Sequence, residues 1–173
     1  MTDDLRRLIP ECVFLNAVII DCAVKTDAFA ECQTSLLKKV GYRNPDGYHY
    51  KNPAFLAGFL YCLIVVPHET WDLPKDHDIY QQLESKELLS LFEIKIRDKK
   101  YPDSPMYGLI YHLRNAVAHA HFSIDQSQAF TFWDKLPLKE APLNWQVWIS
   151  NPNLMTFLNG VAHVFLPNDP LRR

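Results

Sequence analysis

The apolar run from Ala54 to Val66 limits the possible folds of this chain more than any other segment. It lies between Pro53 and Pro67, and apolar side chains occupy nearly every side of the helix that its length favours. Such a helix is buried all round, so we expect it at the centre of a helical bundle. The run is shorter than the ~20 residues that a membrane-spanning helix needs. The sequence therefore predicts no membrane partner.

Composition and charge indicate an ordinary water-soluble domain. The chain has 173 residues, of which 48% are hydrophobic and 22% charged, so we expect a single domain over residues 1–173 with its own core. The formal net charge of −2 provides no overall basic field of the kind that non-specific nucleic-acid binders carry. Any surface that binds RNA must therefore be small and local.

The cysteines and the N-terminus predict a cytoplasmic protein. Four cysteines lie in apolar helical contexts without a C-x-x-C spacing, and they are Cys12, Cys22, Cys32 and Cys62. This pattern favours buried, reduced thiols over a zinc site or disulfides. The first residues are acidic where a secretory signal would be basic.

Hydrophobic periodicity predicts a mainly helical bundle with a small antiparallel sheet in the C-terminal half. Helices are expected over residues 10–22, 26–39, 53–66, 79–94, 105–119 and 151–165, and strands over 122–124, 130–132 and 145–149. The first two helices could be continuous, and the segment 79–94 could be one helix or two. After His119 the apolar period changes from that of a helix to that of a strand, which predicts a β-hairpin closed by residues 125–128.

The helix that begins at Ser104 carries a polar stripe on an otherwise apolar surface. Ser104 can cap this helix, and Pro105 suits its first position because proline has no N–H to leave unpaired. Four residues fall within about 60° of one another at helical spacing: Gly108, His112, Asn115 and His119. Arg114 lies beside this stripe.

The run from Arg114 to His119, with Asn115 after the arginine, resembles the Arg-x(4–6)-His signature of the HEPN superfamily. The resemblance implies a small helical bundle and a metal-independent endoribonuclease without a cofactor. It also implies a homodimer that acts as a toxin or an antiviral-defence effector, with a cognate antitoxin as a further partner. The hairpin after this helix resembles a plasmid- and phage-associated subgroup of the superfamily.

These residue types suit RNA cleavage because RNA carries its own nucleophile, the 2′-hydroxyl. Histidine titrates near neutral pH and can move the protons, while arginine offers a charged planar fork to phosphate oxygens. The expected products have 2′,3′-cyclic phosphate and 5′-hydroxyl ends. One imidazole cannot act as base and acid at once, so a two-fold dimer with a composite active site would supply the second.

We predict Arg114, His119, Asn115 and His121 as catalytic residues. His121 also fits the signature, so the sequence does not decide which histidine is the main one. Asn115 is expected to hold the imidazole of His119 or to contact the phosphate. Gly108 would let a partner helix approach closely. The predicted substrate-binding residues are His112, Tyr111, Lys99 and Lys100, and no metal ligands are predicted.

Four other interpretations compete with these assignments. Arg114 could pair with a carboxylate, such as that of Asp125 or Asp134, and fix the hairpin, and His112 could be a structural or surface histidine. The chain could be a non-catalytic HEPN-type module for binding or dimerisation in a defence system. It could also be a metal-dependent hydrolase that uses its histidines, although no nearby cysteine or glutamate completes a familiar ligand set.

Overall fold

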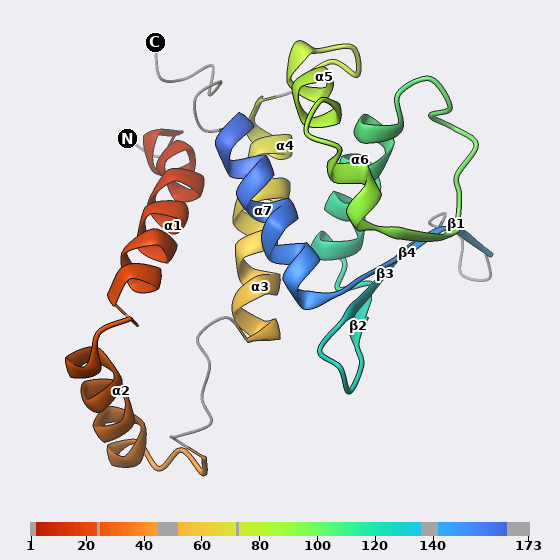
Figure 1. Cartoon of the computed structure of the whole chain (residues 1–173). Helices are drawn as coiled ribbons and strands as arrows, with labels where there is room; N and C mark the ends of the chain where they lie inside the picture. Colours follow the sequence, from red (N-terminus) through yellow and green to blue (C-terminus); the bar gives the residue numbers. More distant parts are fainter. Residues whose placement is uncertain (1–2, 24, 45–51, 72, 136–141, 166–173) are drawn as a thin grey trace.

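The computed structural model describes residues 3–23, 25–44, 52–71, 73–135 and 142–165. Its helices are α1 (Asp3–Ala23), α2 (Asp27–Lys39), α3 (Pro53–Leu60), η2 (Tyr61–Val65), α4 (Val66–Trp71), α5 (Asp78–Glu84), η3 (Leu88–Leu91), α6 (Pro105–Ala118) and α7 (Asn151–Phe165). Its strands are β1 (Glu93–Ile96), β2 (Phe122–Ile124), β3 (Phe130–Lys135) and β4 (Leu143–Ile149). The predicted class, mainly helical with a small antiparallel sheet, is confirmed (Figure 1).

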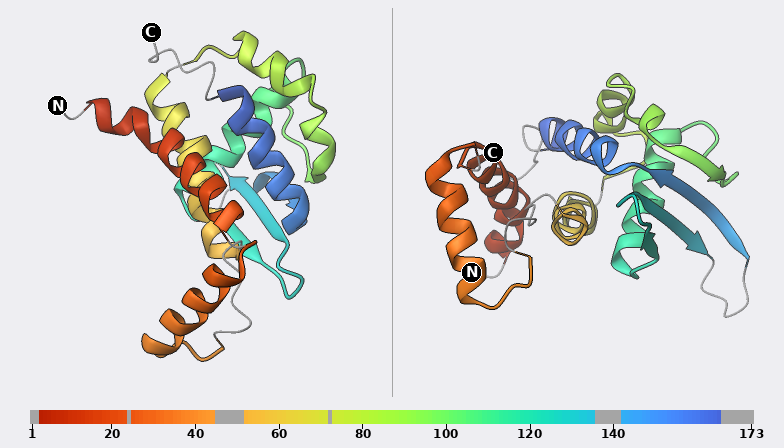
Figure 2. Two further views of the ribbon diagram at one scale, coloured as in Figure 1. Left: turned by 60° about the vertical axis from the view of Figure 1, so that its left-hand side comes forward. Right: turned by 60° about the horizontal axis from the view of Figure 1, so that its bottom comes forward.

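The segments α3, η2 and α4 form one central helix from Pro53 to Trp71. Asn52 caps it by accepting the Phe55 N–H at 3.0 Å, and side chains such as Leu60 and Leu63 are fully buried. It contacts α1, α6 and α7, and Figure 2 shows α1 and α2 on the opposite side of it from the sheet. The predicted central position is therefore confirmed.

The central helix continues beyond Val66, where the sequence led us to expect its end. The segment η2 is π-helical, so its hydrogen bonds reach one residue further than in an α-helix, as in the bond from Val66 N–H to the Tyr61 carbonyl. This π-helical turn lies just before Pro67, whose nitrogen has no hydrogen to donate. Because the wider turn leaves room for the proline ring, the helix continues as α4. By length and hydropathy alone, the extended helix is one that could cross a membrane.

The four strands form an antiparallel sheet in the order β1-β4-β3-β2. The predicted hairpin is present, with Phe122 opposite Phe132 and Ile124 opposite Phe130. Its turn is held by Asp125, whose Oδ1 accepts the N–H groups of Ser127 and Ala129. The predicted strand over 145–149 is also confirmed as part of β4.

Strand β1 was not predicted, because residues 79–94 were expected to be helical. Only α5 and the short η3 are helical in this segment, and Glu93–Ile96 is extended. The strand exists because Ile94 pairs with Val147 of β4, more than fifty residues away. The expectation that residues 68–77 form an irregular connection is likewise wrong for residues 68–71, which belong to α4.

Helix α6 packs on the sheet and closes the main core. Fully buried side chains from both layers meet there, including Leu113 of α6, Phe132 of β3 and Val147 of β4. Helix α7 covers the other side of the core with Phe157 and Leu158, both fully buried. The sheet therefore fixes the position of the helix that carries the predicted site.

The N-terminal helices α1 and α2 are separate and only lightly packed. The break lies at Thr26, which caps α2 in an extended conformation. No residue of α2 is buried. Exposed apolar side chains remain on α1 (Leu15, Val18 and Ile19), on α2 (Leu36) and at Val40, the residue that caps the C-terminus of α2. All four cysteines are free thiols, but Cys12, Cys22 and Cys32 are exposed, so their predicted burial is wrong.

Candidate functional site

Helix α6 positions the site through its own apolar face. Leu109, Leu113 and Ala116 are buried in the core, which fixes the rotation of the helix. Pro105 occupies the first turn as predicted, whereas Ser104 takes the cap position without a side-chain hydrogen bond. The helix ends at His119, its C-terminal cap residue.

Arg114 is held by one neighbour on its own helix and one on the central helix. Its Nη1 donates to Asn115 Oδ1 at 2.7 Å, and its Nη2 donates to a carboxylate oxygen of Glu69 on α4. The Nε atom is buried without a hydrogen-bond partner among the described residues. About a quarter of the side chain, 26%, is exposed. Arg114 therefore pairs with a carboxylate, as the alternative interpretation expected, but that carboxylate belongs to Glu69 and not to Asp125 or Asp134.

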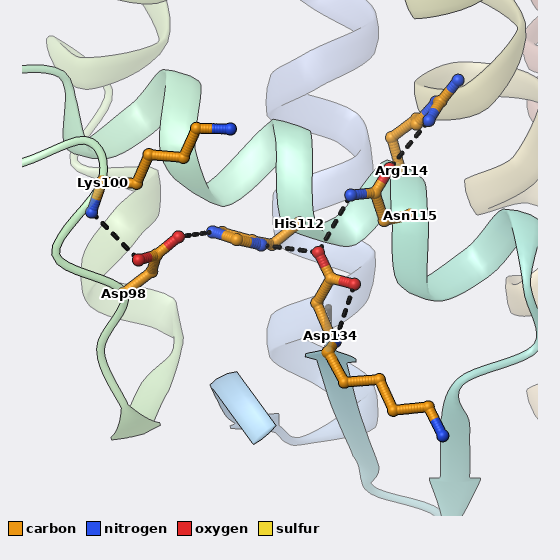
Figure 3. Close-up of polar contacts among 7 residues, drawn as sticks. Asp98, Lys100, His112, Arg114, Asn115 and Asp134 are labelled. Carbon is orange, nitrogen blue, oxygen red and sulfur yellow. Dashed lines mark hydrogen bonds and ion pairs between the residues drawn. The ribbon is translucent and has the colours of Figure 1, made fainter. Parts of the chain in front are cut away.

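Asp134 of β3 joins two predicted site residues of α6 (Figure 3). Its Oδ2 accepts the Asn115 side-chain amide at 2.9 Å and lies 2.8 Å from His112 Nδ1. Its Oδ1 accepts the backbone N–H of Lys135 at 2.9 Å. Burial by itself raises the pKa of Asp134, but the hydrogen bonds from His112 and Asn115 and the charge of His112 outweigh it, so the pKa is lowered.

His112 is a buried residue between two carboxylates. Its side chain is 2% exposed, its Nε2 lies 2.9 Å from Asp98 Oδ2, and its ring stacks on Trp145 with centroids 5.0 Å apart. An imidazolium donates from both nitrogens and so matches an acidic neighbour on each side. The prediction that His112 contacts substrate does not fit this burial, and the alternative structural interpretation fits it well.

Both ends of the Asn115 amide are occupied by Arg114 and Asp134. Its side chain therefore does not hold the imidazole of His119, as one hypothesis required. Only its backbone carbonyl contacts that residue, by accepting the His119 N–H at 3.0 Å. Gly108 does not face an open surface either, because a Cβ there would lie 3.2 Å from Tyr101 of the same chain.

His119 and His121 lie together just beyond the end of α6. Their ring centroids are 5.7 Å apart, and the chain turns between them at Ala120, which has a left-handed φ of 54°. His119 is exposed. His121 is half-buried, stacks on Trp133, and has an Nδ1 without a hydrogen-bond partner among the described residues.

The predicted site thus consists of two adjacent groups on one helix end. Arg114 and Asn115 form one group, and His119 and His121 form the other. Within the described ranges, no hydrogen bond or ion pair joins either imidazole to the guanidinium. The carboxylates Glu69 and Asp98 were missed. Glu69 has no local sequence signal because it comes from a distant helix, and Asp98 lies within a charged run that resembles a solvated segment.

The other predicted substrate-binding residues lie on the loop before α6 and on the helix surface. The Lys100 ammonium lies 5.1 Å from the ring centroids of both Tyr101 and Tyr111. Its hydrogen bond with Tyr101 is the main reason that the pKa of Lys100 is raised. Lys99 is exposed and Tyr111 is partly exposed. In the part of the chain that the structure describes, no three acidic, histidine or cysteine side chains are grouped as metal ligands would be.

Comparison with known proteins gives one match. A family model described as HEPN pEK499 p136 matches residues 16–171. No curated protein and no solved structure matches the chain significantly. The matched range includes α6, the hairpin and every predicted site residue.

Proposed function

Because the chain belongs to the HEPN pEK499 p136 family, we propose that it is a metal-independent endoribonuclease. Proteins of the HEPN type are typically ribonucleases, and the residues of this chain suit that role. The observation that carries the proposal is the exposed end of α6, where a guanidinium and two imidazoles come from residues 114–121. These groups provide charge stabilisation and proton transfer without a metal.

In the proposed reaction one imidazole takes the proton from the 2′-hydroxyl, whose oxygen attacks the adjacent phosphorus. The P–O5′ bond breaks, and a second imidazole protonates the departing oxygen. The products carry a 2′,3′-cyclic phosphate and a 5′-hydroxyl. Exposed His119 and half-buried His121 are the two proton carriers, and Arg114 donates to the phosphate oxygens as charge develops. Asn115 positions Arg114, because its amide oxygen accepts from that guanidinium.

His112 and Asp134 are positioning residues in this proposal. Asp134 fixes the Asn115 amide, and His112 fixes Asp134 from the side facing the core. RNA would lie along the outer surface of α6 and the loop before it. Lys99 and Lys100 would contact its phosphates, and the partly exposed Tyr111 would stack on a base.

We further propose that the active form is a homodimer. Exposed apolar side chains on α1 and at the end of α2, among them Ile19 (64% exposed) and the cap residue Val40 (71% exposed), provide a surface for the contact between two copies. A two-fold axis would bring a second set of site residues toward the first. The biological role that fits is a toxin or antiviral-defence effector, with a cognate antitoxin as its inhibitor.

The alternative is a non-catalytic HEPN-type module. One observation favours it. Arg114 donates to Glu69 and to Asn115, and Asn115 in turn donates to Asp134 of the sheet, which is the pattern expected of a structural residue. In that case replacing Arg114 would lower the free energy of unfolding, and the wild-type protein would have no ribonuclease activity.

The test is cleavage of RNA in the presence of EDTA, with the chain ends of the products identified. Wild-type protein should cut, and Arg114→Ala and His119→Ala should cut at least a hundredfold more slowly. Arg43→Ala and His163→Ala are matched controls, because both residues are exposed and far from α6 in sequence. Unfolding curves for all variants distinguish a loss of catalytic activity from a loss of folded protein. A wild-type protein that never cleaves RNA, together with an unstable Arg114→Ala variant, would favour the non-catalytic module.

A further inference from the structure

Helix α2 has no buried residue, and it makes only sparse contacts with the other described elements. Figure 1 shows it projecting from the end of α1, away from α6 and α7, and Figure 2 agrees. A helix of 13 residues is marginal in water without tertiary packing. The outer surface of α2 therefore indicates which kind of partner would cover it.

Two parallel stripes of side chains run along α2, and only one of them is half-buried. Phe29, Gln33 and Leu37 recur every four residues on the half-buried stripe. The neighbouring stripe is exposed, ends at the cap residue of the helix, and consists of Ala28, Cys32, Leu36 and Val40. Leu36 is 59% exposed and Val40 is 71% exposed. Side chains at four-residue intervals form a ridge, and two such ridges packed together make the commonest contact between helices.

This exposed ridge is symmetric about Thr34. If a second copy of α2 runs antiparallel across a two-fold axis at Thr34, residues at equal distances before and after it lie opposite each other. Cys32 then faces Leu36 of the partner subunit, and Ala28 faces Val40 of the partner subunit. Each contact occurs twice and sets a small side chain against a larger one. The ridge therefore complements itself along its whole length.

The charges of α2 have the same symmetry. Asp27 and Glu31 lie in its first half, and Lys38 and Lys39 lie in its last turn. Glu31 and Lys38 are exposed on one flank of the ridge, and among the described residues neither has an ion pair or a hydrogen bond. They are roughly 10 Å apart along the helix axis, too far to pair with each other. In the antiparallel arrangement, Glu31 meets Lys38 of the partner subunit, and this pair forms twice.

We propose that two copies of the chain associate through α2, as an antiparallel helix pair centred on Thr34. A helix that is acidic at its start and basic at its end fits a copy of itself better than a partner of one charge sign. Leu15 and Ile19 of α1 supply further exposed apolar area, because two short helices alone would bury less than the ~1,200 Å² of a stable interface. This pairing rests on the proposed homodimer, to which it gives a defined element and orientation, and it needs no RNA cleavage.

The first test exchanges the charges of the pair in the full-length protein, without RNA. Sedimentation equilibrium should give a dimer for wild type. Glu31→Lys and Lys38→Glu should each raise the Kd of the dimer about tenfold or more, because each places two like-charge pairs in the contact. Lys86→Glu, at an exposed lysine outside α2, is the matched control and should leave the Kd unchanged.

An equimolar mixture of Glu31→Lys and Lys38→Glu should associate like wild type. In the mixed dimer, both pairs again join opposite charges, which happens only if position 31 of one copy meets position 38 of the other. The proposal is overturned if wild type stays monomeric at high micromolar concentration, or if the mixture associates no better than its components.

A further variant tests the apolar ridge. Leu36→Asp should give a monomer, because it places a charge at the centre of the contact, while Leu143→Asp, at an exposed leucine on β4, should not. Circular dichroism confirms that each variant is folded. A dimer that persists in Leu36→Asp would show that another surface joins the two copies and would overturn the proposal.

The exposed thiols report where the two-fold axis lies. The two Cys32 residues of the pair would be about 6 Å apart along the helix axis, on facing surfaces. A short bifunctional thiol reagent should therefore link two copies of Cys12→Ser/Cys22→Ser, which keeps Cys32, and not two copies of Cys22→Ser/Cys32→Ser, which keeps Cys12. Equal linking of the two variants would move the axis to α1 and overturn the proposal. Because every measurement is made without RNA, a failure to associate is distinguishable from a failure to cleave.

Discussion

The side-chain amide of Asn115 donates to Asp134 at 2.9 Å, and this bond connects the helix that carries the site to strand β3. The same Asp134 oxygen lies 2.8 Å from His112. A single carboxylate therefore sets the positions of two residues of α6, and indirectly that of Arg114, which donates to Asn115.

We expect this connection to make the protein sensitive to acid. The pKa of Asp134 is lower in the folded protein than its ordinary value of 3.8, so its contribution to stability is complete above about pH 4 and is lost as the pH falls through the folded pKa. Asp134→Asn should lower the free energy of unfolding at pH 7 by about 1–3 kcal/mol. Urea unfolding between pH 3 and 7 should also show a weaker pH dependence for the variant than for wild type. An unchanged pH dependence would contradict this account.

Glu69 should limit the affinity of the site for RNA. Its carboxylate pairs with Arg114 and repels a phosphate that approaches the same guanidinium. Glu69→Gln keeps an acceptor for Arg114 but removes the charge, so KM for RNA should fall by about two- to fivefold with kcat little changed. Glu87→Gln, at another exposed glutamate, serves as the control. A higher KM in Glu69→Gln would mean that the charge of Glu69 positions Arg114.

The two histidines beyond α6 should divide the proton transfers. Wild-type kcat/KM should depend on pH as a bell, because one imidazole must be neutral and the other protonated. His119→Ala and His121→Ala should each remove one limb of the bell and reduce the rate by roughly 10²- to 10⁴-fold. The measurement is a pH–rate profile of each variant on one RNA. Loss of the same limb in both variants would show that only one proton transfer depends on this pair.

Dimer formation should depend on the apolar surface of α1. Ile19 is 64% exposed there, and Ile19→Asp would place a charge in the proposed contact between two copies. Light scattering after gel filtration should report a dimer for wild type and a monomer for the variant, and RNA cleavage should fall with the dimer. Ile124→Asp is the matched control, because Ile124 is an exposed isoleucine on β2 (42% exposed). A dimer that persists in Ile19→Asp would place the contact elsewhere.

The packing of α7 against η3 should not tolerate an added methyl group at Gly160. A Cβ there would lie 2.7 Å and 2.8 Å from the two terminal carbons of buried Leu88. Gly160→Ala should therefore lower the free energy of unfolding by about 1–3 kcal/mol. Gly58→Ala is the control, since nothing lies within 4 Å of a Cβ at Gly58, and alanine there should be neutral or stabilising by up to about 1 kcal/mol. Thermal unfolding of the two variants measures the difference.

Local patterns were enough to predict the elements that depend on neighbours in sequence. The start of α6 at Pro105 and the hairpin around Asp125 follow from local chemistry, and α7 starts at Asn151 as expected. Strand β1 forms by pairing with β4, which is distant in sequence. Its alternation of apolar and polar residues is short and directly follows the leucines of η3, so it could not be recognised from local pattern. The same limit applies to the site. The signature located Arg114 and His119, but only the tertiary structure brings Glu69 to the guanidinium and Asp98 to His112.

The π-helical turn of η2 changes the directions in which the side chains of α4, the next segment of the same helix, point. Each residue of an α-helix rotates the chain by about 100°, so one surplus residue in the wide turn changes the direction in which every later side chain points. Glu69 follows that turn, and it meets Arg114 with this offset in place. Deleting one residue between Tyr61 and Val65 would convert the turn to regular α-helix and rotate the Glu69 carboxylate away from Arg114. The ion pair of Arg114 therefore depends on a π-helical turn in a different helix.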